Sequence, residues 1–342
     1  ICVKPVFLSP SFCRSLTAKA LALFLAPVSV FAGALSASGI PDPSISASLP
    51  SALADPGGVR AAVAARGVTY GLNYIGEVLS NRTGGIEQGT IYDGRMELYV
   101  DADLEESLGF AGLAFHAHGY QLHGEGVTVT KVGNLNALSG IEALATTRLL
   151  DIWLEQKLLD ERLSIRIGQM AVDTEFILAD SAGQFISASF GWPTITAPNL
   201  PNGGSAYPLA APGVRLEYAA SNALTVRAAV FNDDPAGPCD TDPQICNPHG
   251  LDFRMSDRPF VIAEAEYRYN RNTLSLWLPG TVKIGAWADF ADFDDQRFDE
   301  SSTSLVDPAS TGVPRSHNGN QGFYVILDQQ LYSNASGSET VS

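Results

Sequence analysis

The residues of this sequence best suited to acid–base chemistry are carboxylates spaced two or four positions apart. Glu264 and Glu266 are two positions apart, and Asp151 and Glu155 are four apart. Each pair projects from one face of an extended strand. Glycoside hydrolysis uses two carboxyl groups about 5–9.5 Å apart, and such spacings reach that separation. Similar sets recur on nearly every predicted strand, however, and this recurrence favours the polar lining of a barrel over one catalytic pair.

Histidines are the candidates for metal binding. His116 and His118 fall on one face of a predicted strand, and His123 follows close by. Two imidazoles need a third ligand to hold zinc, and that ligand would have to come from another part of the chain. The sequence alone therefore predicts no metal and no other cofactor.

A run of acidic residues near the C-terminus could hold calcium through carboxylate oxygens. The run comprises Asp289, Asp292, Asp294, Asp295, Asp299 and Glu300. A solvated outer loop has the same composition, so calcium is only a hypothesis. The sequence contains no Gly-x-Ser-x-Gly motif, P-loop or dinucleotide fingerprint, and we therefore do not expect an enzyme.

The segment 148–170 indicates which elements position these groups. Apolar residues occupy alternate positions on both sides of Asp160 and Glu161, which indicates two strands joined by a tight turn. The expected apolar face comprises Leu150, Ile152, Leu154, Leu163, Ile165 and Ile167, and the opposite face comprises Asp151, Trp153, Glu155, Ser164, Arg166 and Gly168. A helix would mix the charged residues among the leucines, so a helix is excluded.

The same alternation recurs along the chain and predicts about ten strands. They cover residues 68–78, 92–101, 110–120, 150–158, 163–170, 214–218, 224–230, 260–269, 282–290 and 321–332. A soluble β-sandwich would also alternate, with its charged face toward solvent. The pattern of faces therefore leaves a lipid-embedded barrel and a soluble scaffold open.

The lengths of the connections favour the barrel. Connections are short at 102–109, 159–162, 219–223 and 270–280, and long at 121–147, 170–212, 232–258 and 291–320. Short turns at one rim and long loops at the other are typical of outer-membrane barrels. Tyr and Phe also gather near strand ends, as interfacial girdles do. We therefore predict an all-β, antiparallel up-and-down transmembrane β-barrel.

Residues 1–34 are predicted to be a signal peptide. Lys4, Arg14 and Lys19 precede an apolar core at 20–31, and Val30-Phe31-Ala32 supplies a small-x-small cleavage signal. The alternative is a membrane anchor, but the apolar run is shorter than the about 20 residues that a spanning helix needs. We therefore expect export to the bacterial outer membrane.

Charge and the remaining segments complete the expected organisation. The formal net charge of −16 excludes nucleic acid as a partner, and loss of three basic residues with the signal would take it to −19. Residues 35–67 are predicted to be a partly helical periplasmic lead-in. Residues 68–342 are predicted to be the barrel domain, truncated, because the sequence starts at Ile1 and ends in a polar run.

Two cysteines, Cys239 and Cys246, lie in a proline-rich loop. In an exported protein this arrangement favours a disulfide that closes the loop. A zinc site is the alternative, but only His249 is nearby as a third ligand.

Aromatic residues on the charged face indicate what the lumen would bind. Trp153, Trp287, Tyr99 and Tyr120 stand among carboxylates and guanidinium groups. Sugars stack on aromatic faces while their hydroxyls bond to charged groups. A selective diffusion pore for carbohydrates is consistent with this combination.

Over most of residues 68–332 the sequence resembles the OprB family of carbohydrate-selective porins. The resemblance is carried by the order and spacing of Tyr74-Ile75-Gly76-Glu77, Asn81-Arg82-Thr83-Gly84-Gly85, Tyr92-Asp93-Gly94-Arg95, Asp103-Leu104, Ile152-Trp153-Leu154-Glu155-Gln156, Arg166-Ile167-Gly168-Gln169, Glu175-Phe176, Phe190-Gly191-Trp192-Pro193, Tyr207-Pro208-Leu209, Pro212-Gly213-Val214-Arg215, Gly322-Phe323-Tyr324 and Asp328-Gln329-Gln330. It implies a sixteen-stranded barrel that passes glucose and other sugars by diffusion. It also implies that the loop at 170–212 folds inward as a constriction.

The expected function is passive, carbohydrate-selective diffusion, with outer-membrane lipid and lipopolysaccharide as surroundings and a homotrimer as a compatible assembly. An exported glycoside-active enzyme or lectin and a non-functional porin fragment are the alternatives. The predicted pore-lining residues are Glu77, Asp93, Arg95, Glu97, Asp151, Trp153, Glu155, Arg166, Arg215 and Arg227, with Glu175 and Phe176 on the constriction loop.

Overall fold

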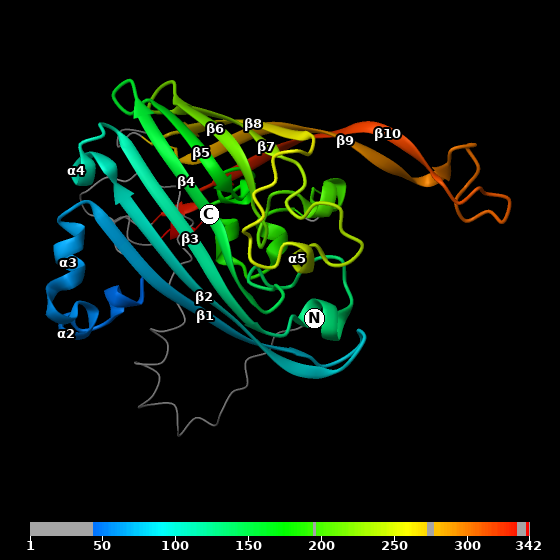
Figure 1. Ribbon diagram of the computed structural model, residues 1–342, viewed down its shortest axis with the longest axis horizontal. Helices are drawn as coiled ribbons and strands as arrows, with labels where there is room; N and C mark the ends of the chain where they lie inside the picture. The colour runs from blue at the N-terminus through cyan, green and yellow to red at the C-terminus, as the bar shows by residue number, and fades with distance from the viewer. Residues whose placement is uncertain (1–43, 194–195, 272–276, 334–339, 342) are drawn as a thin grey trace.

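The computed structural model describes residues 44–193, 196–271, 277–333 and 340–341. Its main element is a ten-stranded antiparallel sheet in which every strand pairs with its neighbours in sequence, from β1 to β10. Figure 1 shows the sheet curving around a group of loops. The predicted all-β, up-and-down architecture is therefore confirmed. Among the described strands β1 and β10 form the two edges and do not pair with each other, so the sheet is open.

All ten predicted strands are present. Their bounds are β1 Val68–Asn81, β2 Gly89–Asp103, β3 Leu113–Gly124, β4 Thr146–Leu158, β5 Leu163–Met170, β6 Ala211–Ala219, β7 Leu224–Asn232, β8 Pro259–Tyr269, β9 Gly280–Asp299 and β10 Pro314–Gln329. A two-stranded sheet joins β11 (Tyr332–Ser333) to β12 (Thr340–Val341). The turns β2–β3, β4–β5, β6–β7 and β8–β9 are short, as the connection lengths predict, and the β1–β2 connection at 82–88 is short as well.

Helices are short and lie outside the sheet. Residues 44–67 hold η2 (Ile45–Ser48), α2 (Ser51–Ala54), η3 (Pro56–Gly58) and α3 (Val59–Ala64), and the strand connections hold α4 (Leu104–Leu108), η4 (Thr128–Val132) and α5 (Pro243–Cys246). None of the helices in the described part of the chain is long and apolar enough to cross a membrane. The predicted signal peptide at 1–34 lies outside the described residues, and the domain boundaries stay a prediction.

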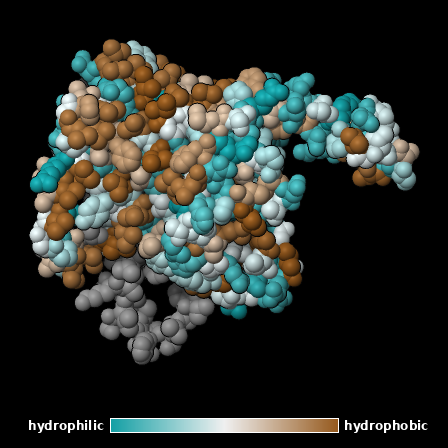
Figure 2. Space-filling view, viewed as in Figure 1, coloured by the Kyte–Doolittle hydropathy of each residue, from teal (hydrophilic) through white to brown (hydrophobic). Residues whose placement is uncertain are grey.

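The two faces of the sheet differ as the alternation predicts. Apolar side chains such as Val78, Ile167 and Ile284 are exposed on the convex face, whereas charged side chains such as Arg166 and Glu264 are buried on the concave face. In Figure 2 hydrophobic residues gather over the part of the molecule that holds the strands, and the projecting end of the β9–β10 hairpin is mostly hydrophilic. Apolar side chains on the outside and charges on the inside are the reverse of a soluble core.

One residue of the expected apolar face, Leu150, lies on the concave side instead of the convex side. It is only 1% exposed and packs inside with Tyr120 and Leu122, whereas Leu154 is exposed as predicted. The pairing of β3 with β4 shifts between His118↔Asp151 and Gly119↔Leu149, so Leu150 is the extra residue of a β-bulge. A bulge adds one residue to one strand and changes the phase of the alternation beyond it.

The acidic run at 289–300 was expected in a loop, and this expectation was wrong. Strand β9 continues to Asp299 and pairs with β10 up to Pro314, so most of the predicted loop 291–320 is a long hairpin. This hairpin extends away from the rest of the sheet (Figure 1). Charged residues at alternate positions are compatible with a strand when both faces meet water, so polarity alone did not mark the strand end.

Candidate functional site

The connection between β5 and β6 folds onto the concave face of the sheet. It contains the short helices η5 (Val172–Thr174), η6 (Ala182–Gln184), η7 (Ala188–Phe190), η8 (Ala197–Asn199) and η9 (Pro201–Gly203). Residues 176–181 of this connection, which we call the inner loop, reach strands on the far side of the sheet. The Ile177 N–H donates to Glu264 of β8 at 3.2 Å, and Lys283 of β9 donates to the Leu178 carbonyl at 2.7 Å.

Apolar side chains anchor the inner loop. Phe176 is 1% exposed and belongs to a cluster with Val172, Phe231 and Phe260. Phe176 therefore does not face open space as a pore-lining residue would, and that expectation needs correction. Its large apolar side chain is withdrawn from water against strands β7 and β8, which fixes the loop on the wall.

A second anchor lies at the other end of the β5–β6 connection. The Tyr207 hydroxyl donates to the Ile141 carbonyl at 2.8 Å, and the Tyr207 N–H donates to Asp173 at 3.0 Å. Burial raises the pKa of the Asp173 carboxyl to about 7, and it raises the pKa of Tyr207 to about 12. Loss of hydration disfavours the ionised form of both groups.

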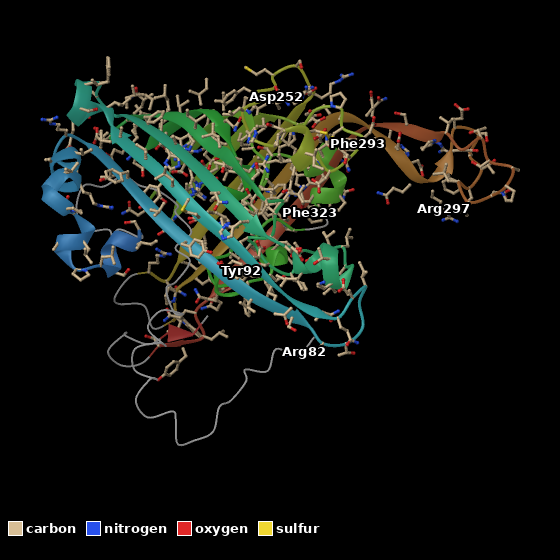
Figure 3. All side chains as sticks on the ribbon, turned by 60° about the horizontal axis from the view of Figure 1, so that its bottom comes forward. Arg82, Tyr92, Asp252, Phe293, Arg297 and Phe323 are labelled. Carbon is tan, nitrogen blue, oxygen red and sulfur yellow. A yellow bond between two sulfur atoms is a disulfide. The ribbon has the colours of Figure 1, made fainter. Side chains whose placement is uncertain are left out.

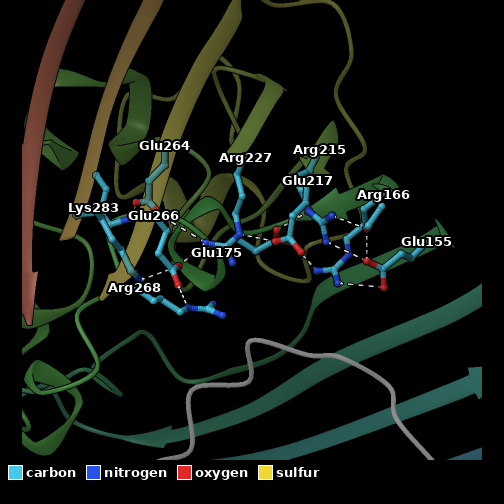
Figure 4. A network of polar contacts seen from close by, with 12 residues as sticks. Glu155, Arg166, Glu175, Arg215, Glu217, Arg227, Glu264, Glu266, Arg268 and Lys283 are labelled. Atoms are coloured by element: carbon cyan, nitrogen blue, oxygen red, sulfur yellow. Dashed lines mark hydrogen bonds and ion pairs between the residues drawn. The ribbon is translucent and has the colours of Figure 1, made fainter. Parts of the chain in front are cut away.

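Four predicted residues meet in one ion-paired cluster, which we call the first cluster. Arg166 of β5 pairs with Glu155 of β4 at 3.4 Å and with Glu175 of the β5–β6 connection. Arg215 of β6 pairs with the same two carboxylates, at 3.1 Å to Glu155. Figure 4 shows the two arginines lying between the two glutamates. The first cluster therefore holds two cations and two anions, with both guanidinium groups buried.

A second cluster continues the row across β6 to β9. Arg227 of β7 lies at its centre and pairs with Glu217, with Glu266 at 3.0 Å and with Glu264 at 3.5 Å. Arg268 and Lys283 also pair with Glu266, the latter at 3.7 Å. The second cluster thus holds three cations and three carboxylates, and Figure 4 shows it beside the first.

The predicted pore-lining set included Arg227, and Glu264 and Glu266 were assigned to the polar lining, but Glu217, Arg268 and Lys283 were not among the predicted site residues. Glu264 and Glu266 alternate along β8, and Glu217 and Lys283 occupy the same face of β6 and β9. That alternation was the available signal. The sequence could not show which carboxylate each arginine contacts, because the contacts depend on the register between strands.

The remaining predicted residues lie nearer β1 and β2. Arg95 pairs with Glu97, and its guanidinium carbon lies 4.8 Å from the centre of the Tyr120 ring and 5.2 Å from that of Tyr207. Glu77 and Asp93 are direct cross-strand partners on the same face. These residues form a separate group, and among the described residues no ion pair joins them to either cluster.

Trp153 connects the first cluster to strand β3. The Arg166 guanidinium carbon lies 3.6 Å from the centre of the Trp153 ring, and His116 stacks on the ring at 4.7 Å. Gly168 is opposite Trp153 on β5, and a Cβ there would lie 2.2 Å from the Ile152 carbonyl oxygen. Only glycine fits at this close approach of β5 to the backbone of β4.

The loop between β7 and β8 is closed by a disulfide between Cys239 and Cys246, whose Cα atoms are 6.1 Å apart. Both thiols are used by this bond, which removes the alternative zinc site with His249. Arg148 donates to the Asn247 carbonyl at 2.6 Å, so the loop is tied to the inner side of β4. In Figure 3 Asp252 marks this loop, apart from the hairpin residues Phe293 and Arg297.

The charges of the two clusters are balanced over short distances. The first cluster has two cations and two anions, and the second has three of each. Such a wall presents many hydrogen-bonding groups without a large net field.

Comparison with known proteins identifies the family. A model of the carbohydrate-selective porin, OprB family, matches residues 87–341. This chain belongs to that family. Porin B of Pseudomonas aeruginosa is 22% identical over 297 residues, which cover 82% of this chain and 61% of the relative.

A solved porin shares the fold. The high-pH structure of Pseudomonas putida OprB matches with a TM-score of 0.71 and 20% sequence identity, over 83% of this chain and 66% of that chain. The chain therefore spans less than two thirds of the length of either family member. At this identity the likeness concerns the fold, and the roles of individual residues rest on the geometry described above.

Proposed function

We propose that this chain forms part of the wall of an outer-membrane pore through which glucose-like sugars diffuse passively into the periplasm. The observation that carries the proposal is the row of compensated charges on the concave face, from Glu155 to Lys283, which ends beside Trp153. Membership of a carbohydrate-selective porin family supports the same class of solute.

The geometry suggests how a sugar would pass. Hydroxyl groups of a sugar exchange water for the partly exposed members of the row, Glu217 and Arg268, and each exchange is weak enough for release because these two groups are already ion-paired. The inner loop narrows the passage because it is tied to β8 and β9 through Glu264 and Lys283.

The same proposal covers the surroundings of the chain. The exposed apolar residues of the convex face would contact outer-membrane lipid and lipopolysaccharide, as the lipid-facing positions of barrels do. Export would depend on the predicted signal peptide at 1–34. A homotrimer is compatible with the family and stays a prediction.

Permeation in reconstituted vesicles tests the proposal. We expect faster swelling of proteoliposomes in glucose than in potassium gluconate, because a compensated wall does not favour an anion of similar size. Equal rates would show a general porin without selectivity for sugars. No permeation of either solute would refute a pore.

A pair of arginine variants makes the test specific. Arg215→Gln leaves Glu155 and Glu175 with one cation fewer, so we expect slower glucose permeation and a higher cation conductance. Arg297→Gln removes the same charge from the hairpin, where Arg297 is exposed and remote from both clusters. We expect this control to behave like the parent, and equal losses in both variants would contradict a role of the first cluster.

A further inference from the structure

Three side chains with metal-binding atoms meet on the concave face near Trp153. They are His116 and His118 of β3 and Asp151 of β4, and their ligand atoms all lie within 4.8 Å of one another. His118 and Asp151 are direct cross-strand partners. The sequence supplied the two histidines but not the third ligand, because β3 and β4 are separated by a long connection. The register of the two strands brings that ligand into place.

His116 is already oriented as a metal ligand would be. Its Nδ1 lies 2.7 Å from the Asp101 carboxylate of β2, and its ring stacks on Trp153. Histidines that bind metals commonly donate one ring N–H to a carboxylate, which leaves the other nitrogen free for the ion. Asp101 and Trp153 thus fix both the tautomer and the plane of the ring.

His118 and Asp151 complete the set. The Nε2 atom of His118 is buried and has no hydrogen-bond partner among the described residues. A buried imidazole nitrogen without a partner is costly, and a metal ion would satisfy it. Asp151 is also buried, and the Ala171 N–H holds its carboxylate at 2.8 Å. Two imidazoles and one carboxylate therefore converge with their supporting contacts in place.

We propose that His116, His118 and Asp151 bind one divalent first-row transition-metal ion, of the Zn²⁺ type, on the wall of the pore. Imidazole nitrogens select zinc, copper or nickel over calcium and magnesium, which take oxygen ligands. Zinc bonds of about 2.0–2.2 Å place tetrahedral ligands about 3.3–3.6 Å apart. Small side-chain rotations are enough to reach that spacing from the observed one.

Three protein ligands leave a fourth coordination position, as in open zinc sites. The His116 side chain is 16% exposed, so the ion can enter from the concave side. The bound ion would lie beside Trp153, at the end of the first cluster. Its fourth position would accept a water molecule or a solute oxygen.

Zinc binding to the purified full chain in detergent tests the proposal. Competition of Zn²⁺ with a chromophoric chelator should give one high-affinity site per chain. His118→Gln and Asp151→Asn should each weaken that site by at least about tenfold, a loss at least as large as that caused by removing a supporting partner. His123→Gln is the matched control, because His123 is on the same strand but outside the set.

A second readout separates loss of the site from loss of the fold. His118→Gln removes no hydrogen bond of the Nε2 atom, so far-ultraviolet circular dichroism should match the parent. Cu²⁺ at this site should quench the fluorescence of Trp153, and Trp153→Phe should abolish the stoichiometric part of the quenching. Absence of a stoichiometric site in the parent, full zinc affinity in His118→Gln, or equal weakening by His123→Gln would overturn the proposal.

Discussion

Two long connections of this chain leave the same rim of the sheet and take opposite courses. The β5–β6 connection turns inward and fixes itself on the wall through Phe176, Ile177 and Tyr207. The β9–β10 hairpin extends outward, as Figures 1 and 3 show. The inward connection carries apolar anchors that the sheet buries, whereas the hairpin is organised by its own hydrogen bonds.

The hairpin tip depends on one carboxylate. Asp299 is fully buried within the turn, where it accepts hydrogen bonds from the Thr303 N–H at 2.7 Å, the Ser310 hydroxyl at 2.8 Å and the Thr311 N–H at 2.8 Å. A turn whose polar groups are hydrogen-bonded in this way needs no contact with the rest of the sheet to be ordered. The comparison teaches that burial of a few apolar side chains, rather than length, distinguishes the connection that folds inward from the one that extends outward.

The calcium hypothesis for the acidic run loses support from this arrangement. The oxygens of Asp299 are engaged by the turn, and Asp292 and Asp294 lie on a strand rather than in a loop. Among the residues that the structure describes, the group with converging metal ligands is the one on β3 and β4.

The largest expected effect is that of Phe176→Ala. Removal of a buried phenylalanine costs about 3–5 kcal/mol, and here the cost falls on the packing of the inner loop. We expect the loop to detach, with higher conductance and faster proteolysis within the β5–β6 connection. Phe323→Ala is the control, since Phe323 is 87% exposed on β10. An unchanged conductance in Phe176→Ala would show that the loop does not depend on this anchor.

Asp299→Ala should have a smaller effect on conductance, because its effect is purely local. The turn loses several hydrogen bonds to a charged acceptor, but this loss of stability is confined to the hairpin tip and does not reach the inner loop. We expect protease cleavage between 300 and 313, with thermal unfolding of the sheet and conductance as in the parent. A fall in conductance would mean that the hairpin, too, contributes to the passage.

Asp173→Asn should reveal a pH dependence. The folded-state pKa of Asp173 is raised to about 7, so its contribution to stability is present below the unfolded pKa of about 4 and is lost as pH rises through 7. The amide keeps an acceptor for the Tyr207 N–H and cannot ionise. We therefore expect the variant to have a higher Tm than the parent at pH 8, by about 2–4 °C per kcal/mol recovered.

The difference between parent and Asp173→Asn should shrink at pH 4, which differential scanning calorimetry in detergent can measure. A Tm difference that does not vary between pH 4 and pH 8 would contradict the raised pKa.

Tyr207→Phe should have the smallest effect. It removes the hydrogen bond to the Ile141 carbonyl, worth about 0.5–1.5 kcal/mol, and the hydroxyl's hydrogen bond with Arg95, but keeps the ring against Arg95. We expect slightly faster proteolysis of the β5–β6 connection and unchanged ion conductance. A conductance as high as that of Phe176→Ala would make Tyr207, rather than the apolar cluster, the dominant anchor.

The sequence was sufficient to predict the strands and the polarity of their faces, because side chains alternate with a period of two. It was also sufficient to place Glu155, Arg166 and Arg215 on one face. It could not predict which charges pair, since pairing depends on strand register. The burial of Phe176 could not be predicted either, because a loop has no alternation of side chains that would distinguish a buried aromatic residue from one that faces the pore.

Strand β4 shows a further limit of alternation and has a consequence for length changes in this chain. Arg148 and Asp151 are three positions apart, yet both are buried on the concave side, which a regular strand forbids. The extra residue Leu150 reconciles them. Deleting Leu150 would leave Arg148 and Asp151 two positions apart and still facing inward. Deleting a residue at almost any other point of β4 would move the side chains of one half of the strand to the opposite face of the sheet. We therefore expect β4 to tolerate a one-residue deletion only at Leu150.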